Sequence, residues 1–124
     1  MQSKYAQHQD LLKTIIMESQ PIFPTLRLFQ ATVGMFYTKN NVPIKVGTVG
    51  QADLNGWITI KGIAIRIEVE VKSGKSKILK NSAQATWQKL CIKMGVIHIQ
   101  AKSPSQFILE LKKHISNIEC KILP

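Results

Sequence analysis

The chain has 124 residues, of which 44% are hydrophobic and 19% charged, with 17 Lys and Arg against 7 Asp and Glu. This composition excludes a disordered tail, and no apolar run approaches the length of a bilayer-spanning segment. We therefore expect one folded domain over residues 1–124, without a membrane segment or a signal peptide. The net charge of +10 favours a polyanionic partner such as nucleic acid over an acidic protein.

The N-terminal third predicts one helix and one strand. An apolar stripe that includes Leu11 and Ile15 indicates a helix from Gln2 to Ser19, which the prolines at 21 and 24 end. Residues 25–38 are apolar and aromatic, and predict a strand that bends near Gly34. A turn at 39–41 and a loop over 43–50 should then lead into the centre of the chain.

Strict alternation marks the central element. From Ile63 to Lys72, β-branched residues occupy one face, whereas the other carries Ala64, Arg66, Glu68, Glu70 and Lys72. This period of two predicts a half-buried strand, and residues 54–60 read as its partner strand. A two-residue turn at Lys61-Gly62 would make the pair a hairpin with Asp53 directly opposite Glu70.

That register predicts a metal site. Two directly opposed carboxylates repel each other unless a cation lies between them, and Mg²⁺ accepts carboxylate oxygens while keeping positions for water and phosphate. Lys72 would project beside the ion on the same face. Asn55-Gly56 is the stronger hairpin signal, and a turn there would pair Asp53 with Ile58 and remove the site. We favour the later turn, because the long strand from Ile63 needs a long partner, and Asn55-Gly56 then reads as a strand irregularity.

The C-terminal half predicts helix, strand and helix. A basic loop holds Lys75, Lys77 and Lys80, and a helix over 82–94 ends at Gly95. Residues 96–101 form a short buried strand. Ser103, Pro104 and Gln106 predict a capped helix start, with a packing face of Phe107, Ile108, Leu111 and Ile115. The fold class is α/β: a mixed central sheet flanked by helices, in the order α-βββ-α-β-α.

These residues resemble a known nuclease family. Asp53 followed by Glu70-Val71-Lys72 is similar to the D…ExK core of the PD-(D/E)XK superfamily. The surrounding Gly50-to-Leu54 motif, Gln84, Trp87 and Gly95 resemble the VRR-NUC (virus-type replication-repair nuclease) family over roughly residues 50–103. The resemblance implies a restriction-endonuclease-like core and catalytic roles for Asp53, Glu70, Lys72 and Gln84. It also implies that Asp53, Glu70 and the Val71 carbonyl bind Mg²⁺, with Mn²⁺ as a substitute.

Several residues have a plainer interpretation beside the functional one. Glu68 either touches metal or forms a salt bridge with Arg66 or a lysine. Gln84 either supports the active site or completes a capping box with Asn81. Trp87 reads as a core residue rather than one that stacks on DNA. The three loop lysines either contact phosphate or are ordinary surface residues. The family's first-helix glutamate has no clear counterpart, and His8, Asp10 and Glu18 all remain open for that role.

The expected function is a Mg²⁺-dependent DNA endonuclease. No base-reading module is apparent, so we expect recognition of DNA structure, such as a branch or four-way junction. The resemblance implies a homodimer. It is also consistent with a phage-encoded protein that acts inside the host cell. Cys91 and Cys120 form no C-x-x-C pair, which favours a cytoplasmic protein. One alternative is a catalytically inactive nucleic-acid-binding module, and another is a basic protein that binds an acidic partner.

Overall fold

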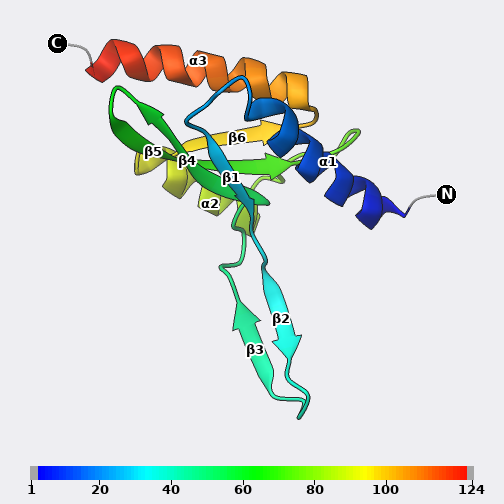
Figure 1. Cartoon of the computed structure of the whole chain (residues 1–124). Coiled ribbons are helices and arrows are strands. Elements are labelled where there is room, and N and C mark those ends of the chain that lie inside the picture. Colours follow the sequence, from blue (N-terminus) through cyan, green and yellow to red (C-terminus); the bar gives the residue numbers. More distant parts are fainter. Residues whose placement is uncertain (1–2, 123–124) are drawn as a thin grey trace.

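The computed structural model describes residues 3–122 as three helices around a mixed four-stranded sheet, with a separate two-stranded hairpin (Figure 1). The elements are α1 (Lys4–Ser19), β1 (Arg27–Gln30), β2 (Gly34–Tyr37), β3 (Pro43–Val46), β4 (Leu54–Ile60), β5 (Ile63–Val71), α2 (Ala83–Lys93), β6 (Ile97–Ala101) and α3 (Pro104–Ile122). The central sheet has the order β1-β4-β5-β6, where only β5 and β6 run parallel. The predicted α/β class with a mixed sheet is confirmed.

The β4–β5 hairpin has the predicted register. Its turn is Lys61-Gly62, where both residues have positive φ angles of 52° and 79°, as a tight two-residue hairpin turn requires. Ile60 pairs with Ile63 at one end and Leu54 with Val69 at the other. Gly56 lies inside β4 instead of in a turn. A Cβ atom there would collide with the Arg27 carbonyl of β1, so close strand pairing requires glycine at this position. The Asn55-Gly56 signal therefore reflects close strand packing.

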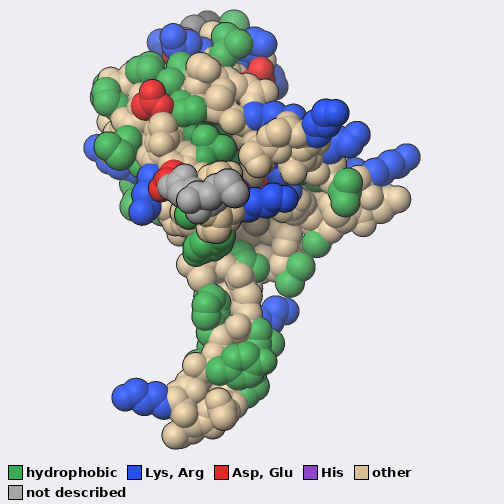
Figure 2. Space-filling view, turned by 90° about the vertical axis from the view of Figure 1, so that its right-hand side faces the viewer, with side chains coloured by type: hydrophobic (Ala, Val, Ile, Leu, Met, Phe, Trp, Pro, Cys, Tyr) green, Lys and Arg blue, Asp and Glu red, His purple; other side chains and the backbone are tan. Residues whose placement is uncertain are grey.

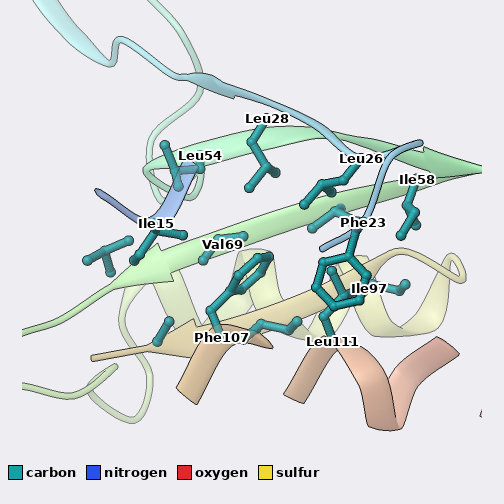
Figure 3. Close-up of a cluster of buried hydrophobic side chains, with 14 of the residues drawn as sticks. Ile15, Phe23, Leu26, Leu28, Leu54, Ile58, Val69, Ile97, Phe107 and Leu111 are labelled. Atoms are coloured by element: carbon teal, nitrogen blue, oxygen red, sulfur yellow. The ribbon is translucent and has the colours of Figure 1, made fainter. Parts of the chain in front are cut away.

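The two faces of the sheet are covered differently. Helices α1 and α3 pack on one face and enclose the apolar core shown in Figure 3, in which Ile15, Val69, Phe107 and Leu111 are buried. The predicted packing face of α3 is confirmed, because Ile108 and Ile115 also pack against this core. Helix α2 lies on the other face, beside β5 and β6 (Figure 1). One face of the sheet thus packs on the apolar core, and the other, on the side of α2, can carry polar side chains.

The predicted bent strand over residues 25–38 is wrong. Its two halves are β1 and β2, which belong to different sheets, and the predicted loop over 43–50 contains β3. Together β2 and β3 form an arm that projects from the body (Figures 1 and 2). At its base Gly47 has φ +74°, and a Cβ atom there would meet the backbone of Thr32. Large apolar side chains are exposed along this arm; they include Met35, Phe36, Tyr37, Val42 and Ile44.

The helix ends follow local hydrogen-bond rules, with one cap shifted by a residue from the predicted position. Ser82, and not Asn81, caps α2, because its side chain accepts a hydrogen bond from the Ala85 amide. Gly95 follows the end of α2 with φ +83°, as predicted. At α3 the Ser103 hydroxyl accepts from the Gln106 amide, while Gln106 reaches back to the amide of Lys102. The predicted start of the first helix at Gln2 lies outside the described residues.

No helix in the described part of the chain is long and apolar enough to cross a membrane.

Candidate functional site

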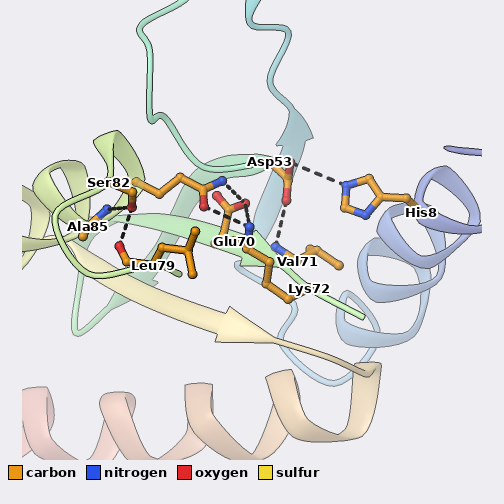
Figure 4. A network of polar contacts seen from close by, with 9 residues as sticks. His8, Asp53, Glu70, Val71, Lys72, Leu79, Ser82 and Ala85 are labelled. Carbon is orange, nitrogen blue, oxygen red and sulfur yellow. Dashed lines mark hydrogen bonds and ion pairs between the residues drawn. The ribbon is translucent and has the colours of Figure 1, made fainter. Parts of the chain in front are cut away.

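The predicted site residues gather where β4 begins and β5 ends. Asp53, Glu70, Lys72 and Gln84 line one open cavity of about 310 Å³ (Figure 4). The other lining residues are His8, Val71, Ser73 and Ser76. Side chains from α1, the β4–β5 hairpin and the first turn of α2 thus converge on one hollow. A second hollow of about 490 Å³ shares Asp53 and Gln84, and extends toward the base of the arm at Val33 and Val49.

Asp53 is fixed by the β5 backbone. It immediately precedes β4, and its Oδ2 atom accepts a hydrogen bond of 2.8 Å from the Val71 amide. Its Oδ1 atom lies 3.6 Å from Nε2 of His8 on α1. The Asp53 carbonyl accepts a bond of 2.8 Å from the Ala31 amide, which ties the residue to the end of β1 as well. The carboxylate is therefore positioned from three elements and still faces the cavity.

Glu70 is a buried acid in an acidic neighbourhood. Its side chain is only 3% exposed. Burial, reinforced by the nearby negative charge of Asp53 and opposed by Lys72, raises the pKa of Glu70 from 4.5 to about 8. Two carboxylates that share a cavity repel each other, and a bound cation would relieve that repulsion. Strongly shifted acids of this kind cluster at functional sites.

Gln84 connects Lys72 and Glu70. Its amide nitrogen donates to Oε1 of Glu70 at 2.8 Å, and its amide oxygen accepts from Nζ of Lys72 at 2.9 Å. Nζ of Lys72 lies 3.6 Å from the same Glu70 oxygen. Because Ser82 caps α2, the proposed Asn81–Gln84 capping box is wrong, and the Gln84 side chain belongs to the cavity. Of the two interpretations of Gln84, the structure places it with the site.

The oxygen donors of this cavity suit a hard divalent cation. Within residues 3–122 no three His, Cys, Asp or Glu side chains group closely enough to form a metal cage. Mg²⁺, however, commonly uses one or two carboxylates together with water and phosphate oxygens. Asp53 and Glu70 supply two carboxylates. Val71 contributes backbone to the lining, because its side chain is buried in the core. These residues therefore fit a Mg²⁺ ion held partly by water or substrate.

Among the first-helix candidates, His8 is the one that the structure brings to the site. It lines the cavity beside Asp53, whereas the cavity lining of the described chain includes neither Asp10 nor Glu18. An imidazole nitrogen is a poor ligand for Mg²⁺, which prefers oxygen. The geometry thus makes His8 a neighbour of the Asp53 carboxylate, 3.6 Å away, rather than a ligand of the ion.

The basic loop lies between β5 and α2, where the sequence predicted it. Lys75, Lys77 and Lys80 are exposed in the segment between β5 and α2, while Ser73 and Ser76 face the cavity. Lys102, outside the predicted set, donates to the Gly74 carbonyl at 2.7 Å and anchors the loop. Ser73 and Ser76 were not among the predicted site residues. Their position as small hydroxyl residues just after the E-x-K motif was the signal that could have identified them.

Glu68 belongs to a separate network beneath α2. It is fully buried, and Arg66 binds its Oε2 atom at 2.8 Å while the Trp87 indole donates to Oε1 at 2.8 Å. The predicted salt bridge between Glu68 and Arg66 is confirmed. Cys91 and His98 lie close to this carboxylate, and burial raises the pKa of Cys91 and lowers that of His98. Glu68 thus stabilises the α2 face and lies outside the cavity.

A scan against protein-family models finds no match for this chain, and neither does a search of the curated proteins.

Proposed function

We propose that this protein is a Mg²⁺-dependent DNA endonuclease with a VRR-NUC-like, restriction-endonuclease-like core. The observation that carries the proposal is the cavity in which Asp53 and Glu70 face each other beside Lys72. In the central sheet alone, the order of elements is helix, three strands, helix, strand and helix, with the arm inserted after the first strand. The geometry of the site and the order of elements support the same family, which the sequence motif also resembles.

The residues divide the hydrolysis of a phosphodiester between them. Asp53, Glu70 and the Val71 carbonyl would bind Mg²⁺, or Mn²⁺ in its place. The ion would polarise the scissile phosphate and lower the pKa of a bound water. Lys72 would orient the attacking water and offset the charge that develops on the phosphate oxygens. Water oxygen bonds to phosphorus as the bond to the 3′ oxygen breaks, which leaves a 5′-phosphate and a 3′-hydroxyl.

Gln84 and His8 act on these groups as positioning residues. Gln84 holds Lys72 at 2.9 Å and Glu70 at 2.8 Å, so a single amide sets the distance between ammonium and carboxylate. His8 lies against the Asp53 oxygen that the Val71 amide does not use. Both contacts limit the rotamers of catalytic groups, and such preorganisation lowers the barrier of the chemical step.

Charge supports DNA as the substrate. Basic residues outnumber acidic ones by 17 to 7, and Figure 2 shows many more basic than acidic side chains on the face that it presents. The exposed loop lysines Lys75, Lys77 and Lys80 lie in the chain between Lys72 and Gln84. They would contact phosphates that flank the cut and would add affinity without base specificity.

Branched DNA and a homodimer complete the proposal. An isolated two-stranded hairpin is marginally stable in water, and exposed apolar patches mark protein interfaces. The exposed side chains of the β2–β3 arm fit contact with a second copy, which would present two active sites to the two strands of a branch point. We place the enzyme in the cytoplasm, where the free thiols of Cys91 and Cys120 would stay reduced.

Cleavage of matched substrates tests the proposal. Purified protein is incubated with a four-way junction, a flap and a linear duplex of matched sequence, in Mg²⁺ and in EDTA. We expect Mg²⁺-dependent cutting of the branched substrates at a higher rate than the duplex. Salt-sensitive binding of all three without any cutting would support the inactive nucleic-acid-binding module instead. Absence of both binding and cutting would support a basic protein with an acidic partner.

A further inference from the structure

Two aromatic rings lie exposed on the α2 side of the sheet, over the β1–β4 part that the helix does not cover. Phe29 of β1 and Trp57 of β4 are 51% and 44% exposed, and their ring centroids are 5.6 Å apart at an interplanar angle of 43°. Large aromatic side chains on strands usually face the core, which here is the opposite face of the same strands. The tilted pair forms an exposed apolar surface at the β1–β4 side of the sheet, open to a ligand.

Arginines flank this surface. The strand register sets Arg27 directly opposite Trp57, and Trp57 directly opposite Arg66, so the three residues form one row across β1, β4 and β5. Directly opposed residues share a face of the sheet. Arg27 donates to the carbonyls of Pro24 and Leu26, which are neutral oxygens and do not cancel its positive charge. Arg66 pairs with buried Glu68 and remains half exposed.

The aromatic surface lies on the same face as the proposed cleavage site. Asp53 precedes β4, and Trp57 follows it four residues later with its side chain on the same side of the strand. At the rise of an extended strand, this separation is about 13 Å. A single strand of DNA that leaves the cavity could therefore reach the aromatic pair within a few nucleotides.

Unpaired bases are the ligand that this combination fits. Bases within a duplex are stacked on each other, whereas unpaired bases stack on exposed aromatic rings while arginines contact the phosphates between them. The charge of Arg27 beside Trp57, in a chain of net charge +10, favours a polyanion over an apolar protein surface. We propose that Phe29 and Trp57 bind the single-stranded segment of a branched or flapped substrate. The inference rests on the proposed function for the identity of that substrate as DNA.

Fluorescence of Trp57 tests the contact directly. The chain has two tryptophans, so Trp87→Phe leaves Trp57 as the only reporter. In EDTA, a 15-nucleotide oligo-dT should quench this fluorescence, and a 15-base-pair duplex at equal phosphate concentration should quench it far less. Because Trp87 binds Glu68, the same comparison is repeated by anisotropy of labelled oligo-dT with the unaltered protein.

Variants then separate stacking from charge. Trp57→Ala and Phe29→Ala should each weaken oligo-dT binding about tenfold, the expected loss of one base–aromatic stack, with little change in duplex binding. Leu109→Ala is the matched control, because Leu109 is 55% exposed on α3, away from this face. Circular dichroism confirms that each variant is folded.

The outcomes distinguish this inference from the proposed function. Unchanged oligo-dT affinity in both aromatic variants would overturn the inference, even if the junction is still cut. A dimer that dissociates on Trp57→Ala, with oligo-dT affinity unchanged, would also overturn it and would identify the face as a protein interface. Stacking on oligo-dT by a protein that cuts no substrate in Mg²⁺ would uphold the inference and reject the nuclease.

Discussion

Replacing Glu70 with glutamine should stabilise the metal-free protein at pH 8. The folded protein raises the pKa of this carboxyl from 4.5 to about 8, so between these values the folded state keeps a proton that the unfolded chain releases. The free energy of unfolding then falls as pH rises, by up to about 1.4 kcal/mol for each pH unit. Below pH 4.5 both states are protonated, and the effect is absent. Above pH 8 the loss is complete.

The magnitude follows from the burial of the group. The Glu70 side chain is only 3% exposed, so water screens its charge little. The full pKa difference corresponds to about 5 kcal/mol, and neighbours that adjust to the charge reduce it. Glutamine keeps the shape and still accepts the hydrogen bond from Gln84. We therefore expect Glu70→Gln to be about 3 kcal/mol more stable than the unaltered protein at pH 8, or about 10 °C in Tm.

Urea unfolding in EDTA at pH 4, 6 and 8 measures this difference. Glu110→Gln is the control, because Glu110 lies on the surface of α3, where it pairs with Lys113 at 3.4 Å. The two Glu70 forms should have equal stability at pH 4 and diverge as pH rises, while the control tracks the unaltered protein. If the free energies of unfolding of Glu70→Gln and the unaltered protein change in parallel from pH 4 to pH 8, the pKa of Glu70 is not raised in the folded protein and the reasoning is refuted.

Three further changes test other parts of the account. Replacing the loop lysines Lys75, Lys77 and Lys80 together with alanine should weaken binding to all duplexes. The slope of log affinity against log salt concentration, measured by anisotropy from 50 to 200 mM salt, should decrease by about 0.9 for each phosphate that the protein no longer neutralises. An unchanged slope would show that the loop does not contact DNA. Lys72→Ala should lower the single-turnover rate constant of cleavage far more than the affinity for DNA. Equal decreases in both would show that Lys72 is an ordinary phosphate-binding residue. Gly56→Ala should lower the free energy of unfolding by about 2 kcal/mol or more, because its methyl group meets the Arg27 carbonyl across the β1–β4 pair, and a stability within error of the unaltered protein would contradict that packing.

Local patterns predicted the centre of the fold well. Strict alternation from Ile63 onward identified β5, and the length of that strand placed the turn at Lys61-Gly62, which brought Asp53 to the Glu70 side of the hairpin. The position of Gln84 came from the family resemblance alone. Its contacts with Lys72 and Glu70 depend on how α2 approaches the sheet, which no local pattern specifies.

Tertiary packing decided the features that the sequence could not predict. Residues 25–38 were interpreted as one bent strand because they are apolar and aromatic, although Met35 and Phe36 are exposed in a separate hairpin. His8 reaches Asp53 because α1 crosses the core face and brings its first turns close to the residue that precedes β4. The spacing of residues along the helix does not predict that contact. Asn81 and Ser82 are both good capping residues. Ser82 is the cap in the folded chain, while Asn81 adopts a positive φ of 65° before the helix begins.

The most direct test of the central claim is single-turnover cleavage of a labelled four-way junction in Mg²⁺ by Asp53→Ala and Glu70→Ala. Both variants should lose cleavage, because each lacks a proposed ligand of the ion, while they bind the junction as tightly as the unaltered protein or more tightly. Asp53→Ala also removes negative charge beside the phosphate, whereas Glu70 keeps its proton in the metal-free protein below pH 8. Binding measured in parallel in EDTA separates the two effects. Cutting at the unaltered rate by either variant would contradict the assignment of these carboxylates to a catalytic metal site.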